Sequence, residues 1–193
     1  MLKTILLTLV AVSIALVGGA GSVWLALDSD FEFDSAVVGN WIAFPVRGTP
    51  AADPYSKARF SREADLALGR AEGIAFIARR DSTGEPLLIE CTYRLEGELP
   101  PARFWTLRAE GSAGDLVFAE GRAPALHSDA LLRQSNNQAV ATVSRHPAPG
   151  NWLAIEGTGP FTLILTLYDT AMASSARIVE VQLPPLLKEA CDV

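Results

Sequence analysis

The stretch FTLILTLYD, residues 161–169, decides the fold because its side chains alternate with a period of two. One face collects the large apolar side chains Phe161, Leu163, Leu165 and Leu167. The other face collects Thr162, Ile164, Thr166 and Tyr168. This alternation is typical of a β-strand that packs one face against a core. The Gly-Thr-Gly-Pro sequence at 157–160 supplies the turn that leads into the strand.

A second stretch, LLIECTYRLEGE at 87–98, shows the same alternation. Its odd positions predict a buried face and its even positions a mostly hydrated face. The buried face consists of Leu87, Ile89, Cys91, Tyr93 and Leu95. Pro100 and Pro101 interrupt further pairing, because proline cannot donate a hydrogen bond to a neighbouring strand.

Shorter stretches predict the remaining elements. Strands are expected at 36–44, 74–81, 102–110, 115–121, 139–145 and 177–184, and a loop is expected at 146–160. A helix is expected over 54–65, with Asp53 as its N-cap and Pro54 at its first position. A short helical turn is expected at 127–134 with Ser128 as its N-cap, and Trp41 and Phe44 are expected to dock on the core. Many short strands with few helices predict a mainly β, jelly-roll-like antiparallel β-sandwich.

The N-terminus carries the other strong signal, because residues 4–27 contain no charged side chain. A helix of about 20 apolar residues can cross a bilayer. We favour an uncleaved transmembrane signal-anchor, since the apolar run continues past Gly18-Gly19-Ala20; cleavage as a signal peptide at that point is the alternative. Lys3 precedes the span and four acidic residues follow it by position 34, so the C-terminal part should face the periplasm of a single-pass inner-membrane protein.

The 193 residues therefore divide into an anchor at 1–27, a juxtamembrane linker with the first strand at 28–52, and a β-sandwich domain at 53–193. Beyond Lys3 the chain has 15 basic and 22 acidic residues, a net charge of −7. Such an acidic surface argues against nucleic acid as a partner. The expected partners are the inner membrane, through the N-terminal helix, and a protein or glycan of the envelope.

The two cysteines, Cys91 and Cys191, predict a disulfide if the domain is exported. Closing a loop of this length would stabilise the fold by about 4–5 kcal/mol in the chain-entropy model. The alternative is a buried free thiol at 91 and an incidental one in the tail.

Catalytic and metal-binding signals are weak. The two histidines, His127 and His146, fall short of the three or four ligands of a zinc site, and His127 with Asp129 is better explained by a surface turn. There is no G-x-S-x-G motif, although a dispersed Ser-His-Asp triad stays open. Nothing in the sequence indicates a cofactor, a metal or a catalytic residue.

Two aromatic-polar clusters are the candidate ligand sites. Arg103 and Trp105 open one strand, and Asn151 and Trp152 open another stretch. Tryptophan at the mouth of a strand can bind sugars or apolar ligands, but it can also close the end of a core. For both tryptophans we favour packing over ligand binding.

The blocks PPARFWTL and GNWL…GPF…L.LYD, with DPYSKA, RDSTGEPL and HSDALLR in the same order, resemble the domain of unknown function 1214 family. The resemblance covers about residues 53–191. It implies a jelly-roll-like β-sandwich and an envelope protein of a Gram-negative bacterium with a short N-terminal membrane helix. It brings no established catalytic residues to this sequence.

These observations favour a membrane-anchored, non-catalytic binding or structural module. The alternative is a hydrolase or carbohydrate-active enzyme that uses dispersed residues. A pocket that holds a histidine or carboxylate with a strongly shifted pKa would favour the enzyme.

Overall fold

The computed structural model describes residues 1–28, 35–63, 68–135, 138–174 and 181–192. Within these ranges the helices are α1 (Leu2–Asp28), α2 (Pro54–Glu63) and the short 3-10 helices η1 (Ser128–Ala130) and η2 (Ala171–Ser174). The strands are β1 (Ala36–Val38), β2 (Trp41–Ala43), β3 (Gly73–Ala78), β4 (Cys91–Gly97), β5 (Phe104–Gly111), β6 (Ala125–His127), β7 (Ala139–Ser144), β8 (Asn151–Ala154), β9 (Phe161–Tyr168) and β10 (Leu186–Cys191).

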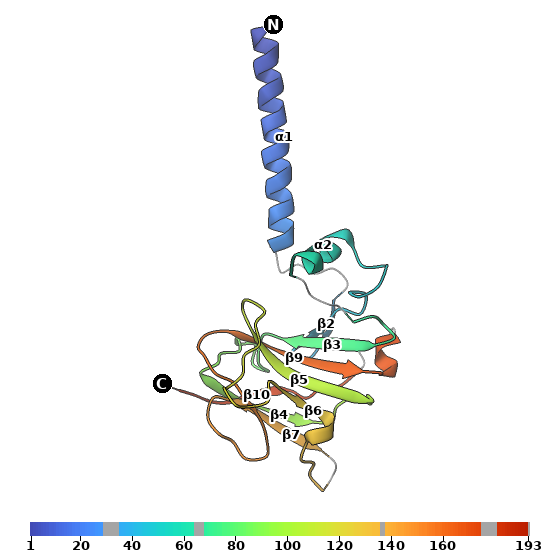
Figure 1. Cartoon of the computed structure of the whole chain (residues 1–193), viewed down its shortest axis with the longest axis vertical. Coiled ribbons are helices and arrows are strands. Elements are labelled where there is room, and N and C mark those ends of the chain that lie inside the picture. The colour runs from blue at the N-terminus through green and yellow to red at the C-terminus, as the bar shows by residue number, and fades with distance from the viewer. Residues whose placement is uncertain (29–34, 64–67, 136–137, 175–180, 193) are drawn as a thin grey trace.

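The strands form two sheets with the core between them (Figure 1). One sheet has six strands in the order β1-β2-β3-β9-β5-β6, and the other has four in the order β10-β4-β7-β8. All pairs are antiparallel except β7 and β8, which are parallel. The expected mainly β fold with few helices is therefore confirmed, and its second sheet is mixed rather than purely antiparallel.

Strand β9 lies in the middle of the six-stranded sheet, between β3 and β5. Leu163, Leu165 and Leu167 are at most 2% exposed, which confirms the face predicted from the alternation. Trp41 packs against the same core with no exposed area, and its indole Nε1 donates a hydrogen bond to the carbonyl of Pro184 at 2.9 Å. Phe44 is only partly buried.

Helix α2 begins as its sequence predicts. The Asp53 carboxylate accepts hydrogen bonds from the backbone N–H groups of Tyr55 and Ser56, at 2.9 and 3.0 Å. These bonds satisfy donors that have no partner inside the helix, as an N-cap does. The helix ends at Glu63 within the described residues, so its expected extent to residue 65 lies partly outside them.

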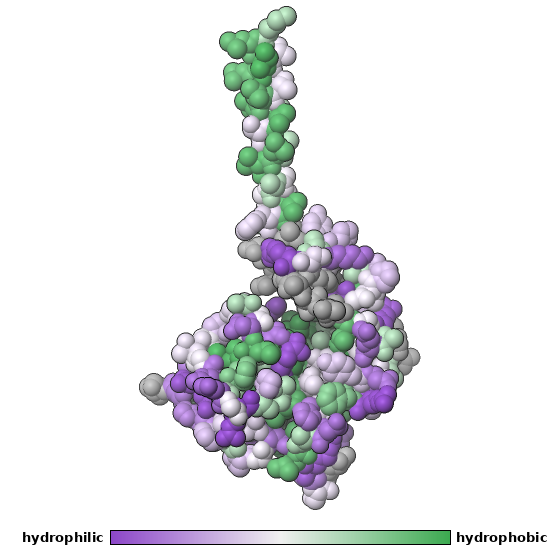
Figure 2. Space-filling view, in the orientation of Figure 1, coloured by the Kyte–Doolittle hydropathy of each residue, from purple (hydrophilic) through white to green (hydrophobic). Residues whose placement is uncertain are grey.

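Helix α1 extends away from the two sheets (Figure 1), and Figure 2 shows apolar side chains along much of its surface. Its segment Leu2–Leu25 has a mean hydropathy of 2.2 and is long and apolar enough to cross a membrane. None of that segment is buried against the rest of the chain. A signal sequence near the N-terminus can also be long and apolar enough in this sense, so the helix is consistent with either an anchor or a signal peptide.

Four local predictions were wrong. Residues 115–121 form no strand and contribute only a bridge between Leu116 and Glu110. The helical turn begins at Ser128, and its N-cap is His127, which makes no side-chain capping bond. The last strand does not end at Pro184 but begins at Leu186, because this segment pairs with β4; residues 177–180 of the expected strand lie outside the described residues. Asn151 and Trp152 belong to a strand, β8, rather than to a loop.

Candidate functional site

The two cysteines form a disulfide that joins β10 to β4. Cys191 and Cys91 face each other directly in the register of the two strands, and Cys91 is 3% exposed. The bridge fastens the C-terminal strand to the edge of the four-stranded sheet. Because the sequence has only these two cysteines, it leaves no thiol for catalysis or metal binding.

Arg103 and Trp105 lie in different environments, one on the surface and the other in the core. Arg103 is exposed and its guanidinium lies 3.6 Å from the Asp169 carboxylate. Trp105 is 7% exposed and lines an apolar void of about 20 Å³ at one end of the core. Outside this void lies a shallow hollow of about 350 Å³, which Trp105 also lines together with Pro100 and Pro101. The indole therefore closes the end of the core.

Asn151 and Trp152 also point in opposite directions. The Asn151 amide is buried, accepts a hydrogen bond from the Leu132 N–H at 2.7 Å, and donates to the carbonyls of Leu132 and Val140 at 2.8 Å each. Trp152 is half-buried on the outer side, where its Nε1 donates to the Ser144 carbonyl at 3.0 Å. The Arg122 guanidinium lies 4.9 Å from the centre of its ring. The four predicted residues do not converge on one site.

Among the described residues, neither histidine ring is hydrogen-bonded to a serine hydroxyl. His146 Nε2 lies 3.0 Å from the Asp192 carboxylate, but the nearby Ser144 hydroxyl donates to the His146 carbonyl at 2.7 Å instead of to a ring nitrogen. His127 packs against Phe104 with ring centres 6.0 Å apart. In the parts of the chain that the structure describes, no three His, Cys, Asp or Glu side chains are placed to hold a metal ion.

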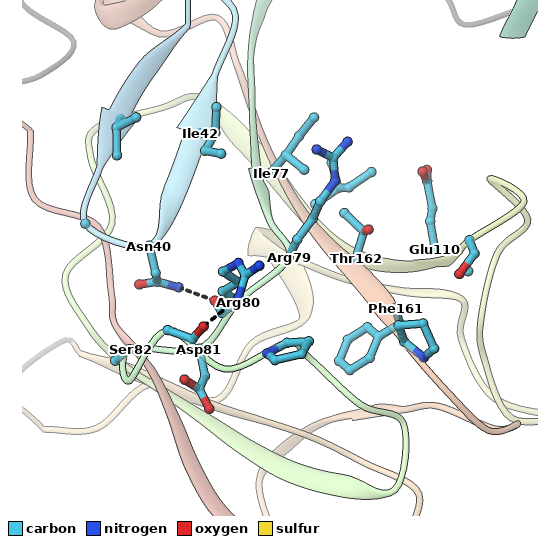
Figure 3. Close-up of a pocket in the computed structure, with 18 of the residues that line it drawn as sticks. Asn40, Ile42, Ile77, Arg79, Arg80, Asp81, Ser82, Glu110, Phe161 and Thr162 are labelled. Atoms are coloured by element: carbon cyan, nitrogen blue, oxygen red, sulfur yellow. Dashed lines mark hydrogen bonds between the residues drawn. The ribbon is translucent and has the colours of Figure 1, made fainter. Parts of the chain in front are cut away.

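The large concavity lies elsewhere, on the outer face of the six-stranded sheet (Figure 3). We call it the sheet-face groove. It encloses about 1310 Å³ and is built mainly from β2, β3, β9, the end of β5 and the turn after β3. Its principal lining residues are Val37, Asn40, Ile42, Arg47, Ile77, Arg79, Arg80, Glu110, Thr162 and Ile164.

Strand register divides the groove floor into two rows. In the first row, four aliphatic side chains lie on four neighbouring strands: Val37, Ile42, Ile77 and Ile164. Ile164 is the deepest of them, at 7% exposed, and Val37 at the sheet edge is 56% exposed. The second row is polar, with Thr162 opposite Glu110 and Arg79 beside them. The groove therefore offers an aliphatic strip beside a polar strip.

The rim of the groove is cationic. Arg47, Arg79 and Arg80 line it. The Arg47 guanidinium lies 5.3 Å from the centre of the Phe44 ring, and Arg80 Nη1 donates to the Gly84 carbonyl at 2.8 Å. Figure 3 shows Arg79 extending alongside Ile77. Of the three arginines, Arg79 is thus the one that the view places beside the aliphatic row.

The acidic groups of the groove are already engaged. Glu110 accepts hydrogen bonds from Arg108 Nε and lies 2.8 Å from Arg108 Nη2. Asp81 has no exposed side-chain area and points away from the groove in Figure 3. Burial by itself raises the pKa of Asp81, but hydrogen bonds from Thr83 and Glu85 and the charge of Lys188 outweigh it, so the pKa lies below its ordinary value. Among the described residues that line the groove, three are arginines and two are carboxylates.

The groove was missed because each of its residues looks ordinary in its own strand. The one available signal was Ile164, a large aliphatic side chain on the face of 161–169 that the alternation assigns to solvent. An exposed aliphatic side chain alone is common on protein surfaces. Only the pairing of four strands places Ile164 in line with three other aliphatic side chains.

Comparison with known proteins gives a family and a fold. The profile of the family described as "Protein of unknown function (DUF1214)" matches residues 72–172. The chain is 17% identical in sequence to the VPA0106 protein from Vibrio parahaemolyticus, and its fold agrees with that crystal structure at a TM-score of 0.58, covering 72% of this chain and 36% of that one. An uncharacterised protein from Burkholderia cenocepacia is 15% identical at a TM-score of 0.43, covering 75% and 45%. This chain thus spans less than half the length of either protein. A search of curated proteins finds no match.

Proposed function

Since the chain belongs to the DUF1214 family of proteins of unknown function, we propose that it is a membrane-tethered, non-catalytic binding module whose binding surface is the sheet-face groove. In this proposal residues 1–27 anchor the chain in a bacterial inner membrane. Residues 28–52 connect the anchor to the sheet, and the domain at 53–193 faces the periplasm of a Gram-negative envelope.

The observation that carries the proposal is the aliphatic row on an open sheet face. A sheet face that is exposed to water normally carries mostly polar side chains. Here four aliphatic side chains line up across four strands and arginines line the same groove. Apolar side chains gathered in a hollow with a few polar groups at its edge are typical of a binding site.

Binding is favoured over hydrolysis by what surrounds the groove. Its carboxylates are engaged, Glu110 by Arg108 and Asp81 within its own turn. Among the described residues, neither histidine lines the groove. A hydrolase would need a nucleophile or an activated water beside a general base.

The charges that flank the membrane span support the proposed orientation, and a reporter fusion tests it. Lys3 on one side of the span and the acidic residues on the other favour export of the C-terminal part. We therefore expect a reporter enzyme that works only outside the cytoplasm to be active when it is fused to the C-terminus. Activity of a reporter that works only in the cytoplasm would contradict the orientation.

Binding at the groove is tested with the full chain in phosphatidylcholine nanodiscs and the fluorescent probe anilinonaphthalene sulfonate, which joins an apolar body to an anion. Wild-type protein should bind the probe saturably beyond the signal of empty nanodiscs. Ile77→Asp places a charge in the aliphatic row and should weaken binding by about tenfold or more.

The matched control is Thr142→Asp, which adds the same charge to the outer face of the four-stranded sheet. It should leave probe binding unchanged, and circular dichroism should show both variants folded. Equal binding by Ile77→Asp and wild type, or no saturable binding by wild type, would overturn the proposal.

A further inference from the structure

We propose that the Cys91–Cys191 disulfide is a redox switch for the sheet-face groove. The intact bond holds β10 and one wall of the groove in place, and reduction of the bond by a dithiol releases both. This inference rests on the proposed binding function and names its regulation.

Two hydrogen bonds join the chain at the start of β10 to elements that form the groove. The Pro184 carbonyl accepts one from the Trp41 indole, which belongs to β2, at 2.9 Å. The Leu186 carbonyl accepts the other from the N–H of Ser82, in the turn after β3, also at 2.9 Å. Pro185, between these two acceptors, itself lines the groove. If β10 leaves its place, part of the groove wall therefore moves with it.

A third contact between β10 and the turn after β3 is electrostatic. The Lys188 ammonium lies 3.6 Å from Oδ2 of Asp81, whose side chain has no exposed area. Among the described residues, this buried oxygen accepts no hydrogen bond, so Lys188 is the group that meets its charge. Leaving a buried carboxylate oxygen without a partner is costly. Release of β10 therefore forces the turn to rearrange until the Asp81 carboxylate reaches water.

Strand β10 depends on the disulfide more than its neighbours do. Among the described strands it pairs only with β4, and its register is interrupted between Lys188 and Ala190. Of its six residues only Leu186 is buried. Strand β4 still pairs with β7 when β10 leaves. Elements with few buried side chains open at lower free energy than the core, so reduction should free β10 before the sandwich unfolds.

The two cysteines allow exchange from one side. Cys191 is exposed, whereas Cys91 is 3% exposed. A thiolate of the dithiol attacks Cys191 Sγ, so that the bond between the cysteines breaks, a mixed disulfide forms, and Cys91 leaves as a thiolate and takes up a proton. The second thiolate attacks the sulfur of its own dithiol and displaces Cys191, which is protonated in turn. The dithiol gives up two electrons and becomes a disulfide, and the protein gains two thiols.

Hydrogen exchange tests the release with the full chain in phosphatidylcholine nanodiscs. Dithiothreitol should raise exchange by about tenfold or more in peptides from β10 and from the turn at 79–86, because both open together. Peptides from β9 should exchange as they do in the oxidised protein. The double variant Cys91→Ala with Cys191→Ser should exchange like reduced wild type, with or without dithiothreitol.

Probe binding tests the consequence for the groove. The measured quantity is the part of anilinonaphthalene sulfonate binding that Ile77→Asp removes, because exposure of Leu186 adds binding outside the groove. Reduction should weaken this part about fivefold or more. The double cysteine variant should bind weakly under both conditions, and Thr142→Asp should respond to reduction as wild type does.

The coupling between bond and groove has to be reciprocal. Saturating probe should therefore raise the ratio of reduced to oxidised dithiothreitol needed for half-reduction, by the same factor by which reduction weakens binding. Alkylation of the free thiols and mass measurement give the reduced fraction. Ile77→Asp should show no such shift, and a bond that only stabilises the fold would give none in wild type.

Faster exchange confined to β10 would overturn the inference, because it separates β10 from the groove wall. A rise that includes β9 would also overturn it, because the bond would then stabilise the fold as a whole. If Ile77-dependent binding is equal in the oxidised and reduced proteins, this inference fails and the binding function stands. If the oxidised protein shows no Ile77-dependent binding, the binding function fails, and hydrogen exchange alone decides whether the disulfide controls the groove wall.

Discussion

The outer faces of the two sheets differ in the kind of side chain they expose: ion pairs on one and aliphatic groups on the other. On the four-stranded sheet, Arg94 pairs with Glu96 at 2.9 Å on its own strand and with Glu189 on β10 at 3.8 Å. On the six-stranded sheet, Ile42, Ile77 and Ile164 lie side by side on neighbouring strands, with arginines in the same groove. The first face satisfies its own charges, whereas the second leaves apolar surface for which water is a poor partner.

The sheets also differ in what stabilises them. In the four-stranded sheet, the Cys91–Cys191 disulfide joins the edge strand β10 to β4. The six-stranded sheet relies on the packing of its central strand β9, whose leucines are buried. We infer that the four-stranded sheet is mainly structural and that the six-stranded sheet carries the binding surface. The following predictions, from the largest effect to the smallest, test this division.

The largest effect is expected from removal of the disulfide in a Cys91→Ala and Cys191→Ser double variant. The bridge closes a loop with a sequence separation of 100. Its loss should lower the free energy of unfolding by about 4–5 kcal/mol in the chain-entropy model. Denaturant unfolding measures the change, and hydrogen exchange should rise first in β10. A loss below about 1 kcal/mol would contradict the structural role of the staple.

Asn151→Ala should have the next largest effect, because it leaves backbone groups of Leu132 and Val140 without their partner. We expect a loss of about 2–3 kcal/mol in the free energy of unfolding. Trp152→Ala should cost less, about 1 kcal/mol, since the ring is half-buried and its contact with Arg122 lies on the surface. Neither change should weaken probe binding at the groove.

A Trp152→Ala variant also distinguishes two roles for this side chain, packing and ligand binding. If Trp152→Ala stays folded and retention on glycan columns falls relative to wild type, the residue is a ligand platform. If retention is unchanged, the indole serves packing alone, and the charged face of the four-stranded sheet has no binding role at this position.

Asp81 links the two sheets, because it follows β3 and lies 3.6 Å from the Lys188 ammonium on β10. Its pKa in the folded protein lies below the ordinary value of 3.8, so its stabilisation is fully present above that pH and is lost as the pH falls through the folded pKa. Asp81→Asn should cost about 1 kcal/mol at neutral pH. Its unfolding free energy should also depend less on pH below 3.8 than that of wild type. Parallel pH profiles for the two proteins would contradict this.

The smallest effect is expected from Arg94→Ala. Arg94 and Glu96 are 40% and 42% exposed, and ion pairs of this kind contribute about 0–1 kcal/mol. Thermal unfolding at low and high salt measures the change, which should shrink as salt screens the charges. A loss above about 2 kcal/mol would show that this face is not simply hydrated.

The comparison of the two faces also explains what could be predicted. Burial of Leu163 or Tyr93 follows from alternation within one strand, so the core positions of 87–98 and 161–169 were correct. The disulfide was also predicted, since the sequence has only two cysteines. The last strand was placed too early because residues 177–184 have strong β propensity, whereas pairing with β4 selects Leu186–Cys191.

The candidate site could not be derived in the same way. Trp105 and Trp152 attracted attention because aromatic side chains are conspicuous in a sequence, yet one closes the core and the other lies on the opposite sheet. Val37, Ile42, Ile77 and Ile164 are inconspicuous singly, and they come from distant parts of the chain.

The sequence by itself determined the apolar N-terminal helix, the strand-rich fold, the buried face of its longest strands and the family of the domain. These properties depend on composition and on spacing between residues close in sequence. Only the tertiary structure decided which strands are neighbours, and therefore which outward side chains form a row. Because strand order depends on contacts between residues far apart in the chain, the sheet-face groove exists only once the six strands are assembled.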